Sequence, residues 1–441
     1  MTPTIPTRWR SILPHLSEPL PPDRTPPRSG DGTGELKINL PTELIRHSVS
    51  AREYWDIPAP VVERYRQYRP TPLWRARGFE EAVGARVPVY VKNEGVNISG
   101  SHKLNTALAQ AHYYREAGVK ELVTGTGAGQ WGTAMAAACA LFGLRCRVFM
   151  VESSLRRKPY RGVLMRMLGA EVHASPSDLT KVAAKEDPAT GNSLSLAIGE
   201  AVEYAAGHDR VAFCIGSGET YSILHQSVIG LEAEQQLAEL DADIGTVVGC
   251  VGAGSNFGGI ALPFHASARA AGREGPRLVA AESSSTPKLT RGVYAYDKTD
   301  ATGSGPMEAM YTIGSDYRIP DAHTAGLRFH GAAKLISALR HSGDVDAVAV
   351  SQADALDAGR LLARHESVLP APESGHALAA AARIAASPGT TGGVLVCVSG
   401  HGYLDLGAYE HFLDGGVEDQ SPPDEALARA VAGLSRVETG S

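Results

Sequence analysis

The stretch Val87–Gly118, VPVYVKNEGVNISGSHKLNTALAQAHYYREAG, contains the pattern that decides the fold. Its first seven residues, VPVYVKN, form a short apolar run that predicts a buried strand. The part KLNTALAQAHYYREAG predicts a helix, with Gly118 as its stop signal. Between them, the turn GSHKLN (Gly100–Asn105) places Lys103 beside His102. A single lysine at a helix start is normally solvated, so the rest of the chain decides whether this one differs.

The strand-then-helix pattern recurs along the chain. Further short apolar runs predict strands: ELVT, RCRVFMV, TVVGCV, RLVAAE, DAVAV and GVLVCV. Alanine-rich segments such as QWGTAMAAACALFG and SGHALAAAARIAA predict helices between them. This alternation is typical of βαβ units, so the sequence predicts an α/β fold with more than one mainly parallel sheet. In such folds, ligands bind at the carboxyl ends of the strands.

The composition excludes several classes of protein. The chain has 441 residues and a formal net charge of −6, without a basic tract, so no nucleic-acid partner is expected. No apolar run of about 18 residues and no signal-peptide core are present, so we expect no membrane span and a cytoplasmic location. The scattered cysteines predict buried free thiols of a reducing compartment: Cys139, Cys146, Cys214, Cys250 and Cys397.

Three predicted strands end in glycine-rich loops: GTGAGQ (Gly125–Gln130), GAGSN (Gly252–Asn256) and SGHG (Ser399–Gly402). The first two also open a helix, where free backbone amides and the helix dipole favour an anion. The spacing of GAGSNFGG does not fit a dinucleotide fingerprint, and no phosphate-binding loop of the G-x-x-x-x-G-K-[ST] type occurs. Two anion-binding corners and a lysine on a third indicate pyridoxal phosphate, whose aldehyde needs an amine.

Several segments, in order, resemble tryptophan synthase β chains. They include RPTPLWRARGFEEAVGARVPVYVKNEGVNISGSHKLNTALAQA, LMRMLGAEV, LHQSVIGLEAE, GCVGAGSNFGGIALPF and APESGHALAAA. The details RRKPYR, PKLTRGVYAYD and MYTIGSDYRIPDAHTAGLRFHG resemble the second, longer β-like branch. The similarity runs from about Ile38 to about Tyr409.

The resemblance implies a fold-type-II pyridoxal-phosphate enzyme of two domains, each with a mainly parallel sheet flanked by helices, that forms a homodimer. We expect an N-terminal extension over residues 1–55, irregular over 1–35, where proline, glycine and charge are frequent. An N-terminal α/β domain with a mobile substrate subdomain is expected over 56–230. A C-terminal α/β domain that binds the cofactor phosphate is expected over 231–415, and a tail over 416–441.

The resemblance also assigns roles to residues. Lys103 is similar to the lysine that binds the cofactor and moves the Cα proton, and Asp316 to the aspartate that closes over the substrate hydroxyl. The positions similar to cofactor-binding residues are His102, Lys103, Asn105, Gly252, Ala253, Gly254, Ser255, Asn256, Glu373 and Ser399. Those similar to the loop that holds the substrate carboxylate are Thr126, Gly127, Ala128, Gly129 and Gln130. A monovalent cation, K⁺ or Na⁺, is expected on carbonyls that include that of Gly252.

The implied reaction is β-replacement on L-serine, or a similar β-hydroxy amino acid, through an aminoacrylate to which a nucleophile adds. The chain departs from the family at Gly125, where relatives have a general acid–base glutamate, and at Gly218, Glu219 and Thr220, where they have larger apolar or amide residues. We therefore predict an altered nucleophile pocket, with open space at Gly125 and a non-indole acceptor. Glu219 is the candidate that supplies the lost carboxylate.

Other functions remain open at this stage. They are ordinary tryptophan synthesis from serine and indole, serine or threonine deamination, and a catalytically silent paralogue that binds a partner. Intact Lys103, Ser399 and GAGSN disfavour the silent paralogue. The sequence identifies neither the nucleophile nor a need for an α-type partner subunit.

Overall fold

The computed structural model describes residues 4–25, 40–184, 193–299, 305–320 and 322–438. Its largest sheet has six strands in the order β13-β10-β9-β14-β4-β3, all parallel except for the antiparallel edge pair β3–β4. These strands are β3 (Leu73–Arg75), β4 (Val89–Asn93), β9 (Ile244–Cys250), β10 (Arg277–Ser283), β13 (Asp346–Val350) and β14 (Gly393–Val398).

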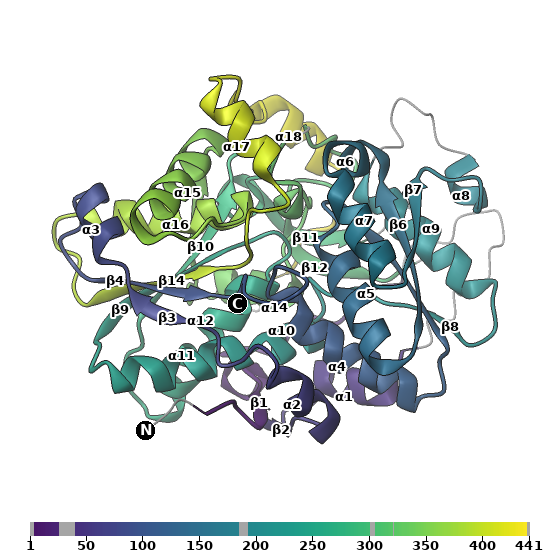
Figure 1. The fold of residues 1–441 in the computed structure, drawn as a ribbon, viewed down its shortest axis with the longest axis horizontal. Coiled ribbons are helices and arrows are strands. Elements are labelled where there is room, and N and C mark those ends of the chain that lie inside the picture. Colours follow the sequence, from purple (N-terminus) through teal and green to yellow (C-terminus); the bar gives the residue numbers. More distant parts are fainter. Residues whose placement is uncertain (1–3, 26–39, 185–192, 300–304, 321, 439–441) are drawn as a thin grey trace.

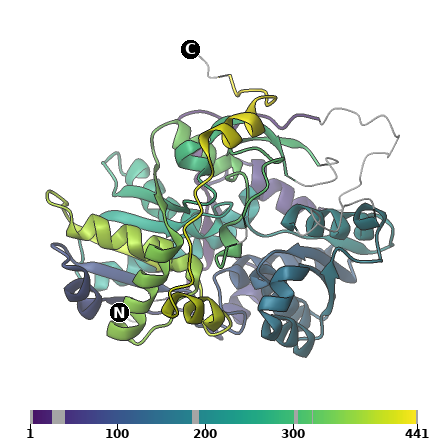
Figure 2. The ribbon, with the colours of Figure 1, turned by 90° about the horizontal axis from the view of Figure 1, so that it is seen from above.

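A second sheet of four parallel strands has the order β7-β6-β5-β8. Its strands are β5 (Glu121–Thr126), β6 (Arg145–Val151), β7 (Glu171–Ser175) and β8 (Val211–Phe213). Figures 1 and 2 show the two sheets in two lobes that lie side by side. The predicted α/β class, with two mainly parallel sheets, is confirmed.

Helices cover both sheets. Around the larger sheet lie α3 (Arg77–Val83), α11 (Val228–Glu239), α12 (Ser255–Ala270), α13 (Lys288–Arg291), α14 (Lys334–His341), α15 (Gln352–Glu366), α16 (Pro372–Ala386), α17 (Leu406–Leu413) and α18 (Asp424–Val431). Around the smaller sheet lie α5 (Gln130–Phe142), α6 (Glu152–Arg157), α7 (Pro159–Met167), α8 (Lys181–Ala184) and α9 (Leu194–Ala206). The others are α1 (Thr42–Val49), α2 (Ala59–Tyr65), α4 (Lys103–Glu116) and α10 (Thr220–Gln226).

The stretch that opened the sequence analysis folds as predicted. Every residue of β4 is buried, with Val89 and Val91 in one hydrophobic core and Tyr90 in the other, because helices pack against both faces of the sheet. Helix α4 begins at Lys103, and Gly118 follows its end in the left-handed conformation, with a φ of 83°.

Sheet membership crosses the expected domain boundary at residue 230. Strands β3 and β4 precede that boundary, yet they complete the larger sheet beside β14. The chain therefore enters the larger sheet first, builds the smaller sheet, and then returns. Helix α4, which connects the two, packs against both α5 and α10.

The expectation of an irregular N-terminus is wrong in one respect. Strand β1 (Arg8–Arg10) pairs with β2 (Tyr54–Asp56) in antiparallel register, and Trp9 is fully buried. The burial of one large aromatic side chain orders a segment whose average composition is typical of loops. Residues 26–35 of the same expected segment lie outside the described residues. Among the described helices, none combines the length and the apolar character needed to cross a membrane.

A two-stranded hairpin, β11 (Val293–Lys298) and β12 (Met307–Thr312), lies beside the carboxyl ends of the larger sheet. The short 3₁₀ turn η2 (Ala325–Leu327) follows it in the chain. Both elements supply walls of the cavity described next.

Candidate active site

A cavity of about 1130 Å³, its open mouth included, lies between the two sheets. Most of the sequence-predicted site residues line it. They are His102, Lys103, Thr126, Gly127, Ala128, Gln130, Glu219, Gly252, Ala253, Gly254, Ser255, Asn256, Glu373 and Ser399. The loops after β4, β5, β9 and β14 thus meet at one place, as the carboxyl ends of parallel strands do.

The turn before α4 fixes Lys103 at the cavity. The side chain of Asn97 accepts hydrogen bonds from the backbone amide and hydroxyl of Ser99, at 3.0 and 2.8 Å, and its amide donates to the Ser101 carbonyl at 3.0 Å. Gly100 has a φ of 71°, and a side chain there would overlap the His401 ring. Burial lowers the pKa of the Lys103 amine, which Glu373 and Cys250 raise in part. A lysine so placed gives up its proton more readily than a solvated one.

His102 connects three parts of the site. Its Nε2 lies 3.1 Å from the Ser255 hydroxyl and its Nδ1 lies 3.1 Å from the Ser399 carbonyl oxygen. Burial, with Lys103 beside it, holds its pKa well below the usual value, so the ring is neutral. His102 therefore ties the lysine turn to the loops that follow β9 and β14.

The loop Gly252–Asn256 leads from β9 into the 16-residue helix α12. A Cβ on Gly252 would come within 2.5 Å of the Gly326 carbonyl oxygen, so the loop packs tightly. Ala253 is not among the residues with positive φ, which confirms that the methyl group at this position is tolerated. The first amides of α12 have no acceptor within the helix and face the cavity wall, as an anion site requires.

The hydroxyl of Ser399 lies across the cavity and is buried. It shares a hydrogen bond of 2.8 Å with the Ser374 hydroxyl, and the Cys250 thiol lies 3.5 Å away. Ser374 also accepts a bond of 2.9 Å from the Ser399 backbone amide. The Ser399 hydroxyl is thus a neutral, oriented group on the cavity wall.

The loop after β5 is joined to Glu373. The Gln130 side-chain amide donates to one Glu373 oxygen at 3.2 Å, and the Gly326 amide donates to the other at 3.0 Å. Gly129 caps α5 with a φ of 87°, and its amide donates to the Thr126 hydroxyl at 3.2 Å. Gly129 is not among the residues that line the cavity, whereas the four other residues predicted in this loop are.

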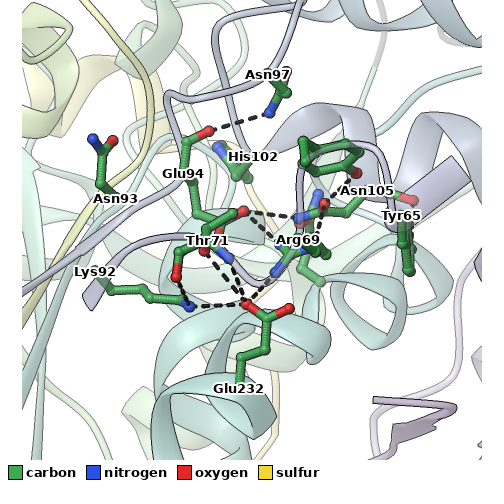
Figure 3. Close-up of polar contacts among 12 residues, drawn as sticks. Tyr65, Arg69, Thr71, Lys92, Asn93, Glu94, Asn97, His102, Asn105 and Glu232 are labelled. Carbon is green, nitrogen blue, oxygen red and sulfur yellow. Dashed lines mark hydrogen bonds and ion pairs between the residues drawn. The ribbon is translucent and has the colours of Figure 1, made fainter. Parts of the chain in front are cut away.

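Asn105 does not line the cavity, although its role was predicted to be cofactor binding. It is fully buried in a network of charges beneath the lysine turn, shown in Figure 3. Its side-chain oxygen accepts from Arg69 at 3.2 Å, and its amide donates to Glu94 at 3.2 Å. Arg69 binds Glu94 at 2.6 Å and Glu232 at 2.7 Å.

Lys92 completes this network through an ion pair of 2.9 Å with Glu232. Two buried cations thus face two buried carboxylates: Arg69, Lys92, Glu94 and Glu232. Lys92 and Glu94 belong to the segment KNEG at the carboxyl end of β4. The network holds the N-terminal turn of α4, and hence Lys103, against α11.

The expectation of open space at Gly125 is wrong. A Cβ there would lie 2.5 Å from the Ala197 carbonyl carbon and 2.5 Å from the Ile198 amide nitrogen, both in the backbone of α9. Backbone atoms of a packed helix cannot move aside as a flexible side chain does. Helix α9, whose Leu194 and Ile198 line the cavity, therefore occupies the space beside Gly125.

Two carboxyl groups face the same cavity from other elements. Glu219 precedes α10, and Glu308 lies in β12. Both side chains are partly accessible, because their exposed surface faces the cavity. Burial raises the pKa of Glu219, and burial with the nearby charges of Glu219 and Asp23 raises the pKa of Glu308 to about 7. Lys334 opposes that rise only in part.

The structure does not bring Asp316 to the cavity, since its side chain is exposed. Sequence reasoning missed Glu308, because alternation along β12 does not show which face meets the cavity. It also missed Arg161, which packs against Gly129 and forms an ion pair of 2.9 Å with Asp405. Two Arg161 nitrogens, Nε and Nη1, are buried without a hydrogen-bond partner in the described residues.

Comparisons with known proteins identify the family to which the chain belongs. The family model for pyridoxal-phosphate dependent enzymes matches residues 65–400. The chain belongs to that family. Its relatives include the tryptophan synthase β chain of Thermococcus onnurineus, 44% identical over 95% of this chain and 96% of the relative. The β chain of Pyrobaculum aerophilum is 47% identical over 92% of this chain and 99% of the relative.

A β chain 2, that of Pyrococcus furiosus, is 41% identical over 97% of both chains. The protein is thus a tryptophan synthase β-like enzyme of the pyridoxal-phosphate family. The crystal structure of a cysteine synthase from Entamoeba histolytica shares the fold, with a TM-score of 0.57 and 17% identity, over 85% of this chain and 96% of that chain.

The cavity of this β-like enzyme fits pyridoxal phosphate. Lys103 offers an amine, the N-terminus of α12 offers amides for the phosphate, and the Ser399 hydroxyl offers a neutral partner for the ring nitrogen. A Cβ on Gly254, whose φ is 138°, would come within 2.6 Å of Ile336, so the phosphate loop is narrow and takes only glycine there. All three groups open into one cavity.

Proposed function

We propose that this enzyme replaces the β-hydroxyl of L-serine, or of a similar β-hydroxy amino acid, and that its acceptor is an aromatic molecule other than indole. The family membership supports the cofactor and the class of reaction. The acceptor proposal rests on which elements form the cavity wall and which of them carry carboxyl groups. Helix α9 fills the position of the family glutamate, while Glu219 and Glu308 face the cavity from different elements.

The groups on the amino-acid side have distinct tasks in this proposal. When bound at Lys103, pyridoxal phosphate supplies an electron-withdrawing ring that stabilises negative charge at the substrate Cα. The Lys103 amine removes the Cα proton and returns it, and burial favours its neutral form. The loop Thr126–Gln130 holds the carboxylate by backbone amides. The Ser399 hydroxyl leaves the ring nitrogen without a proton, which favours replacement at Cβ over transamination.

On the acceptor side, Glu308 and Glu219 divide the proton transfers. With a pKa of about 7, Glu308 is present in both protonation states near neutral pH, as a group that gives a proton to the leaving hydroxyl must be. Glu219 accepts hydrogen bonds from backbone amides, including that of Gly218 at 3.2 Å, which fixes its carboxylate. It takes the proton that the acceptor loses when it attacks Cβ.

The surroundings of these acids select the acceptor. Trp131, Leu194, Ile198 and Phe329 line the cavity, so an aromatic ring is favoured. Two carboxyl groups repel a thiolate and bind N–H or O–H donors. We therefore propose a neutral aromatic that carries an amino or hydroxyl group.

The experiment measures initial rates with serine and one acceptor at a time: indole, 5-hydroxyindole, aniline and thiophenol. We expect the amino- or hydroxy-aromatic to react at least tenfold faster than indole, and thiophenol to react slowest. Glu219→Gln and Glu308→Gln should each lower that rate by about 10²-fold or more, as the loss of a general acid or base does. The matched control Glu116→Gln, at an exposed position on α4, should not change it.

Indole turnover equal to that of the hydroxylated or amino acceptors, unchanged in both glutamine variants, would establish ordinary tryptophan synthesis instead. Pyruvate as the main product under all conditions would identify a deaminase. We also propose that the enzyme is a homodimer; whether an α-type subunit activates it is tested by adding one from a relative to the same assay.

A further inference from the structure

A second buried lysine lies next to the phosphate loop. Lys288 is the first residue of α13, and its side chain is fully buried. A charged amine inside a protein is costly unless it is paired, so its surroundings need an explanation. Neither the family resemblance nor the proposed reaction gives Lys288 a task.

Three backbone carbonyls surround the Lys288 ammonium. Its Nζ lies 3.4 Å from the Val251 oxygen, 3.5 Å from that of Thr286 and 3.5 Å from that of Leu327. An ammonium has three N–H donors, and here three acceptors stand at almost equal distances. Proteins bind monovalent cations with such sets of backbone carbonyl oxygens, and here the Lys288 nitrogen occupies the centre of the set. Glu282, which is buried, adds negative charge nearby.

The carbonyls belong to segments that shape the cofactor cradle. Val251 directly precedes the phosphate loop, and Leu327 ends η2, which lines the cavity. Gly326, the residue before Leu327, touches Gly252 and donates to Glu373. Thr286 supplies the third carbonyl, and its hydroxyl also donates to the Leu327 carbonyl at 3.1 Å. One positive charge thus draws together the phosphate loop and the wall that holds Glu373.

We propose that Lys288 is a built-in monovalent cation, a positioning residue that replaces a free K⁺ or Na⁺ and makes the cofactor site independent of added salt. The cation that the sequence predicted at the Gly252 carbonyl then has a counterpart in the chain itself, one residue away. This role concerns the cradle alone, so it holds whichever acceptor the enzyme uses.

The test uses two variants that differ in the space they leave. Lys288→Ala leaves the space among the three carbonyls empty, whereas Lys288→Met fills this space with an uncharged side chain of similar length. Each is measured in chloride salts of K⁺, NH₄⁺, Na⁺ and tetramethylammonium at equal ionic strength. The readouts are the dissociation constant of pyridoxal phosphate, from its visible absorption, and the melting temperature of the cofactor-free protein. Lys120→Met, at an exposed lysine, is the control.

We expect wild type to show the same cofactor affinity in all four salts, within a factor of two. Lys288→Ala should bind the cofactor at least tenfold more weakly in tetramethylammonium and recover in K⁺ or NH₄⁺, with a higher melting temperature, because the ions bind the folded state. Lys288→Met should be weak in every salt.

Tighter binding of pyridoxal phosphate by wild type in K⁺ than in tetramethylammonium would overturn the proposal, because the three carbonyls would then still need an ion. The same holds if Lys288→Ala responds to no salt. Where the alanine variant fails to fold, the wild-type series and the methionine variant still decide. Because neither serine nor an acceptor is present, the result is independent of the proposed function.

Discussion

At the scale of single residues, the cofactor side of the site is built from neutral or easily neutralised groups. Burial lowers the pKa of both His102 and Lys103, so their charged forms are disfavoured. The acceptor side instead carries two acids whose pKa values are raised by burial, Glu219 and Glu308. In the proposed reaction, these opposite shifts separate Lys103, the base at Cα, from the two carboxyl groups that transfer protons at Cβ.

The raised pKa of Glu308, about 7, predicts a pH dependence of stability. In the unfolded chain this carboxyl ionises near pH 4.5. Between these values the folded state binds the extra proton, so stability falls as pH rises from about 4.5 to 7. Glutamine mimics the protonated form. Glu308→Gln should therefore match wild type in melting temperature at pH 4.5 and exceed it at pH 8.

The measurement is a series of melting curves of the cofactor-free protein from pH 4.5 to 8, with Glu116→Gln as the control for loss of an exposed charge. A constant difference between wild type and Glu308→Gln across this range would show that the carboxyl is not protonated near neutral pH, and the assignment of Glu308 as the acid would be lost with it.

At the scale of elements, the contact between β5 and α9 distinguishes this site from its sequence-based expectation. Because Gly125 has no side chain, the two backbones approach so closely that a Cβ at this position would lie 2.5 Å from backbone atoms of α9. Helix α9 occupies the space beside Gly125 and presents apolar side chains to the cavity. The size of the side chain at position 125 therefore sets how closely this helix approaches β5.

Gly125→Ala tests this contact. The added methyl group must displace the α9 backbone, so we expect a loss of about 1–3 kcal/mol in unfolding free energy and a large loss of turnover. Gly407→Ala is the matched control, because no atom lies within 4 Å of a Cβ there and its φ is not positive. It lies in α17, where alanine is the better helix former. Denaturant unfolding measures both.

An unfolding free energy for Gly125→Ala as high as that of Gly407→Ala would contradict the packing described for α9. Gly125→Glu, which introduces the glutamate that the family resemblance implies at this position, should be less stable still and should not raise indole use. Recovery of indole turnover in that variant would mean that the α9 backbone moves to accommodate a side chain at position 125.

At the scale of the whole molecule, two loops bring exposed apolar side chains to one surface. Val96 and Ile98 are 43% and 57% exposed, and Tyr403 and Leu406 are 64% and 55% exposed. The loops lie side by side, because Ser101 pairs with Gly400 and Gly95 touches His401. Apolar side chains gathered in this way are typical of a surface that another chain covers.

We predict that these residues lie in the interface of the homodimer. Ile98→Asp should convert the dimer to monomers, because burial of an unpaired carboxylate opposes association. Light scattering coupled to gel filtration gives the mass of each form. Val49→Asp is the control, at a residue that is 75% exposed on α1. A wild-type monomer, or an Ile98→Asp dimer of unchanged affinity, would show that the interface lies elsewhere.

The sequence by itself determined the parts that depend on local order. Alternation of apolar strands with alanine-rich helices predicted the two parallel sheets, and the loops Gly252–Asn256 and Thr126–Gln130 followed from their place at strand ends. The turn that places Lys103 at the start of a helix was predicted from the glycine that opens it. These features require only the period of the chain and the conformational range of glycine.

Only the tertiary structure decided what fills the space between segments that are distant in sequence. Asn105 lies in a charge network rather than at the cavity, α9 occupies the position beside Gly125, and Lys288 lies among three carbonyls. Each outcome depends on distances between elements that are separated by many residues. Such distances follow from how whole helices and sheets pack, and a pattern within one element carries no information about them.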